Sequence, residues 1–80
     1  MKNLQKAPYG KISDIAALGQ LISLHRKQQH LTQLKLSQFA GVSPKFISEL
    51  ENGKVTAEIG KTLQVLHYLG LDCIVTPRGF

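Results

Sequence analysis

A short stretch in the middle of the chain carries polar residues of the types that hydrogen-bond to nucleic acids. Lys45, Ser48 and Glu49 are spaced so that a helix would place all three on one face. Lysine can donate to guanine O6 or N7, glutamate can accept from cytosine N4, and serine bonds several bases. Pro44 can meet a thymine methyl, and Ser43 stands at the tip of the same face. These five residues are the candidates for reading base edges, and the alternative for Lys45 is a solvated surface lysine.

The elements that must position these residues are two short helices joined by a tight turn. Thr32 can cap the first, because its hydroxyl accepts an otherwise unpaired backbone N–H. Gly41 can take a left-handed conformation and end that helix. Ser43 can cap the second, with Pro44 at the first helical position, and Asn52 with the following glycine closes it. This order of signals predicts a helix-turn-helix.

The same stretch resembles the DNA-binding motif of the XRE family of phage-repressor-like (Cro-like) proteins. The resemblance covers about 18–71 and implies an all-α, four- to five-helix domain of the lambda-repressor type that binds DNA. The matching residues are Leu31, Thr32, Gln33, Leu36, Ser37, Gly41, Val42, Ser43, Ile47, Ser48, Glu51, Gly53 and Lys54.

A second group of residues is predicted to contact DNA phosphates. Gln33 matches a family residue that bonds the DNA backbone and steadies the recognition helix. The positive ends of both helices would assist neighbouring polar and basic side chains. Phe46 is counted in this group, although its ring can instead face the core margin or a thymine methyl. The candidates are Thr32, Gln33, Lys35, Phe46, Asn52 and Lys54.

Other polar residues are assigned to structure. Arg26 and Glu51 match family positions at which an arginine of the first helix bonds a glutamate at the end of the recognition helix. Bidentate geometry would fix how the two helices meet. His25 is predicted to be a core or edge histidine with a satisfied ring. His30 stands at a helix end where the family has Gly, so an unusual backbone conformation is expected there.

Two longer helices flank the motif within a domain spanning 13–70. The first should start from a cap at Ser13 or Asp14 and run to about Gln29, and the last should be capped by Thr56 and begin near Ala57. Their predicted apolar stripes are Ile15, Leu18, Leu21 and Ile22 in the first, and Ile59, Leu63, Val65, Leu66 and Leu69 in the last. Within the motif, the predicted core residues are Phe39, Val42, Ile47 and Leu50.

The segment 71–80 changes to a strand-like pattern. Its β-branched run predicts a strand over Leu71, Asp72, Cys73, Ile74, Val75 and Thr76. A lone strand leaves unpaired N–H and C=O groups, so pairing with its copy across a two-fold axis would make a homodimer. The alternative is an apolar tail packed on its own helices. A strand after the fourth helix also resembles the HipB-like antitoxin branch of the family.

Composition narrows the class of protein. The net charge of +5 favours an anionic partner, with solubility as the bland alternative. The single cysteine, Cys73, excludes an intrachain disulfide and suits a reducing cytosol. Residues 1–12 contain Pro8 and Gly10 among lysines and are predicted to be a flexible arm. No zinc-ligand spacing, phosphate-binding glycine loop or membrane-spanning stretch is recognised, so neither an enzyme nor a cofactor or metal site is expected.

These observations lead to a main hypothesis and its rivals. The main one is a cytoplasmic, dimeric repressor that recognises double-stranded DNA at a palindromic operator. Its more specific form, implied by the resemblance, is an autorepressing antitoxin that binds a HipA-like kinase toxin. The rival is a protein-interaction module with weak or no specific DNA binding, because Pro44 and Glu49 are unusual base readers. Non-specific RNA binding fits less well, since the chain lacks exposed aromatic platforms.

Overall fold

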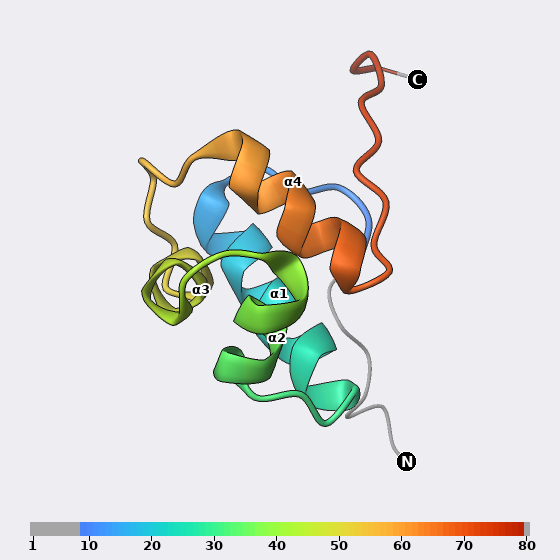
Figure 1. Cartoon of the computed structure of the whole chain (residues 1–80). Coiled ribbons are helices and arrows are strands. Elements are labelled where there is room, and N and C mark those ends of the chain that lie inside the picture. The colour runs from blue at the N-terminus through green and yellow to red at the C-terminus, as the bar shows by residue number, and fades with distance from the viewer. Residues whose placement is uncertain (1–8, 80) are drawn as a thin grey trace.

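The computed structural model describes residues 9–79, which fold into four helices. The helices are α1 (Ile15–Gln28), α2 (Gln33–Ala40), α3 (Pro44–Glu51) and α4 (Ile59–Tyr68). Figure 1 shows α4 crossing over α1, with α3 at one side of the molecule and seen nearly end-on. The predicted all-α class is confirmed for 9–79, although no strand forms within these residues. Most of the predicted arm, 1–8, lies outside the described residues.

The two short helices begin and end where local hydrogen bonding dictates. The hydroxyl of Thr32 accepts from Lys35 N at 3.0 Å, and that of Ser43 accepts from Phe46 N at 3.0 Å. Between the helices Gly41 takes a φ of 72°, in the left-handed region. These contacts confirm the predicted caps and turn, because each satisfies a backbone donor that a helix end leaves unpaired.

α1 is also bounded as predicted. The carboxylate of Asp14 accepts from Ala17 N at 2.8 Å and caps the helix. Just beyond its end, His30 has a φ of 60°, which confirms the unusual backbone conformation expected there. His25 is half-buried, and its Nε2 lies 3.0 Å from the carbonyl oxygen of Leu69. The ring therefore links α1 to the end of α4.

The start of α4 differs from the prediction. The side chain of Glu58 accepts from Lys61 N at 3.2 Å, so Glu58 is the cap and Thr56 is not. The helix consequently begins at Ile59 rather than near Ala57. A carboxylate suits this place because it accepts a hydrogen bond and also stabilises the positive end of the helix.

The buried face of α4 was predicted with the wrong residues on its first two turns. Ile59 and Leu63 are 68% and 43% exposed, whereas Thr62 is 1% exposed. The hydroxyl of Thr62 donates to Glu58 O at 2.9 Å, so burying this polar residue leaves no unpaired group. The predicted burial of Val65, Leu66 and Leu69 is confirmed.

One hydrophobic core joins all four helices and holds α3 in place. Its buried members are Ile22, Leu36, Ala40, Ile47, Leu50, Val65, Leu66 and Leu69, and Val42 packs against them. Phe39, however, is 53% exposed, so its assignment to the core was wrong. Its ring lies instead 5.9 Å from the ammonium of Lys35 on the outer side of α2.

Gly19 allows α1 to approach the end of α3 closely. A Cβ added at Gly19 would lie 2.8 Å from the backbone oxygen of Glu51 and closer still to that of Leu50. These backbone atoms cannot move aside as the end of a flexible side chain could. The orientation of α3 on α1 therefore depends on a residue without a side chain.

The predicted strand is not present in the single chain. Residues 71–76 form no strand, and only Leu71 is half-buried, where it packs against the core. Ile74 and Val75 are 78% and 91% exposed, so close packing of this tail on its own helices is wrong as well. A strand requires a hydrogen-bonding partner, and residues 9–79 of one chain provide none here.

Candidate nucleic-acid interface

The outward face of α3 starts at its open, capped end. Ser43, Pro44 and Lys45 are exposed, and Ser48 and Glu49 are half-buried one turn further on. Burial of Ile47 and Leu50 on the opposite side fixes which face looks outward. In helix-turn-helix proteins the amino-terminal half of the second helix is the part that enters the major groove. The base-reading role of the five residues stays a prediction.

Two residues predicted for different roles contact each other. The ammonium of Lys54 lies 3.1 Å from Oε1 of Glu49, and both side chains are partly exposed. Lys54 N also donates to the carbonyl oxygen of Glu49 at 3.0 Å. A predicted phosphate contact and a predicted base reader thus form one ion pair beside α3.

The capping hydroxyls at the two helix starts can still take part in binding. Thr32 and Ser43 each accept one backbone hydrogen bond, and both residues are exposed. A hydroxyl also carries a hydrogen that it can donate, for example to a phosphate oxygen. Capping is therefore compatible with the predicted phosphate contact of Thr32 and with the predicted base contact of Ser43.

The predicted ion pair between α1 and α3 is formed and is almost fully buried. Arg26 Nε lies 2.7 Å from Oε2 of Glu51, and Arg26 Nη2 lies 2.9 Å from its Oε1. A third guanidinium nitrogen, Nη1, donates to the carbonyl oxygen of Leu31 at 2.8 Å. The single arginine consequently holds the end of the recognition helix and the loop before α2.

Gln33 joins the same cluster rather than pointing away from it. Its Nε2 donates to Oε1 of Glu51 at 3.0 Å. Burial of Glu51 raises the pKa of its carboxyl group, but hydrogen bonds from Arg26 and Gln33 and the charge of Arg26 outweigh this effect, so the pKa is lowered overall. The carboxylate therefore stays charged and fixes the start of α2 to the end of α3.

Phe46 lies at the margin of the core. It is half-buried against the hydrophobic cluster, and the ammonium of Lys61 is 5.8 Å from the centre of its ring. Sequence reasoning did not single out Lys61, because it belongs to α4 and no local pattern places it beside α3. The contact adds one basic side chain to the neighbourhood of the recognition helix.

Asn52 is engaged at the end of α3. Its Nδ2 donates to the carbonyl oxygen of Ser48 at 2.8 Å, and the residue itself is exposed. This bond satisfies a carbonyl group in the last turn of the helix. Its predicted phosphate contact is untested.

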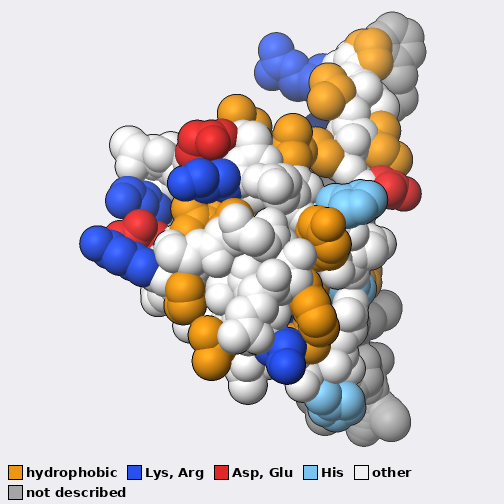
Figure 2. All heavy atoms as spheres, viewed as in Figure 1, with side chains coloured by type: hydrophobic (Ala, Val, Ile, Leu, Met, Phe, Trp, Pro, Cys, Tyr) orange, Lys and Arg blue, Asp and Glu red, His pale blue; other side chains and the backbone are white. Residues whose placement is uncertain are grey.

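Charged side chains gather on the side of the molecule that carries α3. In Figure 2, Lys and Arg groups cluster with Asp and Glu groups over α3 and the connection to α4, and much of the face toward the viewer is uncharged. The basic residues of this region are Lys45, Lys54 and Lys61. Their positive charge is partly offset by neighbouring acidic residues, since Lys54 is paired with Glu49.

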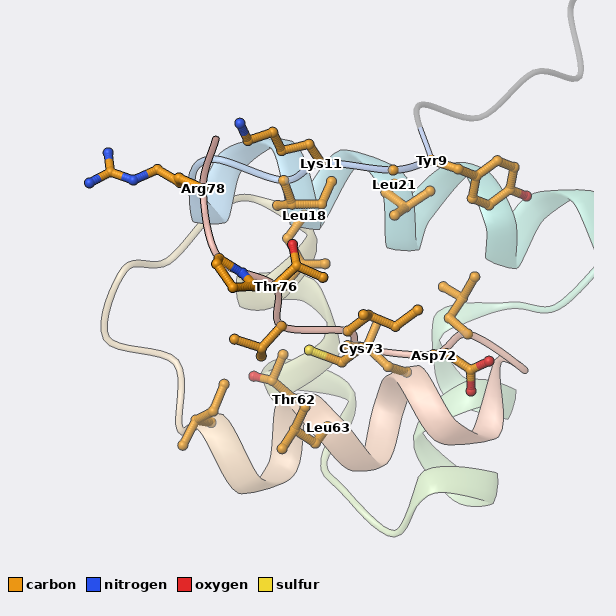
Figure 3. Close-up of a pocket in the computed structure, with 18 of the residues that line it drawn as sticks. Tyr9, Lys11, Leu18, Leu21, Thr62, Leu63, Asp72, Cys73, Thr76 and Arg78 are labelled. Carbon is orange, nitrogen blue, oxygen red and sulfur yellow. The ribbon is translucent and has the colours of Figure 1, made fainter. Parts of the chain in front are cut away.

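A separate apolar groove lies between the tail and the helices. Its volume is about 860 Å³, and it is lined by 9–12, by residues of α1 and α4, and by 70–79. Figure 3 shows Leu18 and Leu21 of α1 facing Leu63 of α4 across it. Ile59, which sequence reasoning placed in the core, also lines this groove. The groove does not include α3.

Residues 9–79 contain neither a metal-binding cluster nor a membrane-spanning helix. No group of three or more His, Cys, Asp or Glu side chains is arranged to hold a metal ion in this part of the chain. None of its helices is both long enough and apolar enough to cross a membrane.

Comparison with known proteins identifies the family. Residues 19–74 match the family model described as "Helix-turn-helix domain". A relative from Sinorhizobium fredii (strain NBRC 101917 / NGR234), named "Uncharacterized HTH-type transcriptional regulator y4mF", is 50% identical over 69 residues. The match covers 86% of this chain and 91% of the relative.

The fold is similar to solved structures of HipB. One, described as "HipB-O4 20mer complex", has a TM-score of 0.80 at 24% identity and covers 88% of this chain and 99% of that chain. Another, "Structure of HipA-HipB-O2-O3 complex", gives the same values. At this identity the likeness establishes the fold alone. Together with the matched domain and the curated relative, the capped helices around Gly41 place this chain in the XRE-type helix-turn-helix family of transcriptional regulators.

Proposed function

We propose that this protein is a dimeric repressor that recognises a palindromic operator in double-stranded DNA. The observation that carries the proposal is the anchoring of α3. Its outward face presents Lys45 and Glu49, while its other end is held to α1 and α2 through Glu51. A recognition helix held in this way presents its side chains to base edges with little loss of conformational freedom.

Phosphate contacts would supply affinity and orientation. Thr32, Gln33, Lys35, Asn52 and Lys54 are proposed for this role, and Phe46 is proposed to support them from the core margin. Backbone phosphates account for much of the binding free energy and make it dependent on salt. Ser43, Pro44 and Ser48 would complete the base-reading face.

The dimer would be built from the tail. Leu71, Asp72, Cys73, Ile74, Val75 and Thr76 are proposed to pair antiparallel with the same residues of a second copy. The exposure of Ile74 and Val75 supports an interface here, because contact with a second copy would remove apolar surface from water. Two recognition helices could then meet successive major grooves about one helical turn apart.

A more specific form of the proposal is an antitoxin that represses its own operon in the cytoplasm. HipB, whose fold this chain shares, occurs in a solved structure together with HipA. By analogy we propose that a HipA-like kinase toxin is the protein partner. Co-purification of a kinase encoded beside this protein, lost when that gene is deleted, would test this form.

The first experiment measures binding of the purified protein to the DNA upstream of its own gene and to a scrambled duplex over a salt series. Specific binding should exceed non-specific binding by roughly a thousandfold or more at physiological salt. Equal and steeply salt-dependent binding to both duplexes would contradict the repressor and favour a protein-interaction module.

A pair of charge-matched variants locates the binding face. Lys45→Gln should weaken binding to the upstream duplex, whereas Arg78→Gln removes the same charge from the exposed tail and should leave binding nearly unchanged. If the two variants bind equally well, α3 is not the surface that contacts DNA.

A further inference from the structure

The ion pair between Glu49 and Lys54 has a consequence for sequence recognition. We propose that Lys54 is a positioning residue that acts through Glu49, so that the pair confers a preference for cytosine at one position of each half-site. This inference rests on the proposed DNA-binding function. It differs from the simpler assignment of Lys54 to a phosphate contact.

The backbone holds Lys54 beside Glu49. Lys54 N donates to the carbonyl oxygen of Glu49, and Gly53 between the helix and Lys54 has a φ of 82°. Gly53 also lies against α1, where an added Cβ would be 3.1 Å from Cα of Ala16. The turn is therefore fixed both by its own hydrogen bond and by packing, and the lysine leaves it next to the carboxylate.

The Glu49–Lys54 ion pair would reduce the repulsion between the Glu49 carboxylate and DNA phosphates. A carboxylate near the phosphate backbone is repelled unless a positive charge compensates it. The Lys54 ammonium supplies that charge 3.1 Å from Oε1 of Glu49. The hydrogen bond from Lys54 goes to Oε1, which leaves Oε2 of Glu49 for a base.

The same contact restricts where the carboxylate can point. Glu49 is 35% exposed and Lys54 is 48% exposed as side chains, so both are accessible to a ligand. With Oε1 on Lys54, Oε2 of Glu49 can accept from cytosine N4. Orientation before binding lowers the conformational entropy lost in the complex. Removing Lys54 should therefore impair discrimination at one base pair and not merely total affinity.

The experiment is selection of bound duplexes from a library randomised over about two helical turns, with the full-length protein and its variants. Wild type should prefer cytosine at one position of each half-site by about tenfold. Glu49→Gln should shift that preference towards adenine, because glutamine pairs with adenine N6 and N7. Lys54→Gln should remove most of the cytosine preference and leave other positions unchanged. Lys54→Arg should retain only part of it, because a guanidinium tends to bind both carboxylate oxygens.

The double variant separates the two roles of Lys54. In the Glu49→Gln background, Lys54→Gln should cause no further change at the cytosine position. If Lys54→Gln instead weakens binding evenly across all sequences, lowers the salt dependence by about one phosphate contact and leaves the cytosine preference intact, Lys54 contacts only phosphate and the proposal is wrong.

Failure of the repressor proposal and failure of the positioning role of Lys54 give different results in this selection. If wild type enriches no sequence, both the repressor and this inference fall. If wild type enriches a sequence that Glu49→Gln does not alter, the repressor stands and only the positioning role is overturned. Thermal unfolding of each variant checks that the fold is retained, which the exposure of both side chains leads us to expect.

Discussion

The guanidinium of Arg26 and the carboxylate of Glu51 join α1 to the last turn of α3 through two hydrogen bonds, of 2.7 and 2.9 Å. Both side chains are less than a tenth exposed. The pair therefore lies behind the recognition helix and not on the surface that would meet DNA. Its role is to hold α3 at a defined angle to the rest of the domain.

Loss of Arg26 should destabilise the fold strongly. Arg26→Met keeps an unbranched apolar stem but strands the buried carboxylate of Glu51, which costs about 3–5 kcal/mol in the free energy of unfolding. Adding Glu51→Gln should cost less than the sum of the two single changes, since it removes the stranded charge. Urea unfolding of the two single variants and the double variant measures this, and additive losses would contradict a coupled pair.

The stability supplied by Glu51 should depend on pH. The folded-state pKa of this carboxyl group lies below its ordinary value of 4.5, so the unfolded chain binds the proton more readily. Its contribution is fully present above about pH 4.5 and is lost as the pH falls through the folded-state pKa. The difference in unfolding free energy between wild type and Glu51→Gln should narrow over that window. If the difference in unfolding free energy between the two proteins stays constant from neutral pH to pH 3, ionisation of Glu51 does not contribute to stability.

A methyl group at Gly19 should separate α1 from α3. Alanine normally stabilises a helix interior relative to glycine by about 1 kcal/mol, but here its Cβ would overlap backbone oxygens of Leu50 and Glu51. We expect Gly19→Ala to lower the free energy of unfolding by about 1–3 kcal/mol.

The matched control for that change is Gly60→Ala in α4. Its Cβ would meet a carboxylate oxygen of Glu58, the cap of α4, and this flexible side chain can shift where backbone cannot. The control should therefore cost no more than a weakened cap, about 1 kcal/mol, and less than Gly19→Ala. Equal effects in thermal unfolding would mean that close helix approach at Gly19 is unimportant.

The tail should control dimerisation. Ile74→Pro removes a backbone N–H and disfavours pairing, while the exposure of Ile74 leaves the four-helix core untouched. We expect wild type to sediment as a dimer and Ile74→Pro as a folded monomer with weaker binding to a two-site duplex. Ile74→Val, which retains the strand preference, should behave as wild type. A dimeric Ile74→Pro protein would place the interface elsewhere.

Sequence signals were sufficient for three of the four helix starts, which are set by bonds a few residues apart, whereas at α4 they indicated Thr56 and the cap is Glu58. Thr32, Ser43 and Asp14 each accept a backbone N–H three residues ahead, so their caps follow from residue type and spacing. The left-handed turn at Gly41 was also predictable, because glycine adopts positive φ angles more readily than other residues. The Arg26–Glu51 pair came from family resemblance, since nothing local links residues 25 positions apart.

Packing between distant residues was decided only in the tertiary structure. Thr62 is buried and Phe39 exposed, against their hydropathy, because the fit of α4 and α2 onto the core determines which face is enclosed.

The candidate nucleic-acid interface also combines features set by local spacing with contacts set by tertiary packing. Helical spacing placed Lys45, Ser48 and Glu49 on one face, whereas folding brought Gln33 to Glu51 and Lys61 to Phe46. Local hydrogen bonding thus determined where helices begin and end, and tertiary packing decided which of their polar residues meet. The reason is physical: a cap depends on neighbours along the chain, and a contact between helices depends on how all of them fill one core.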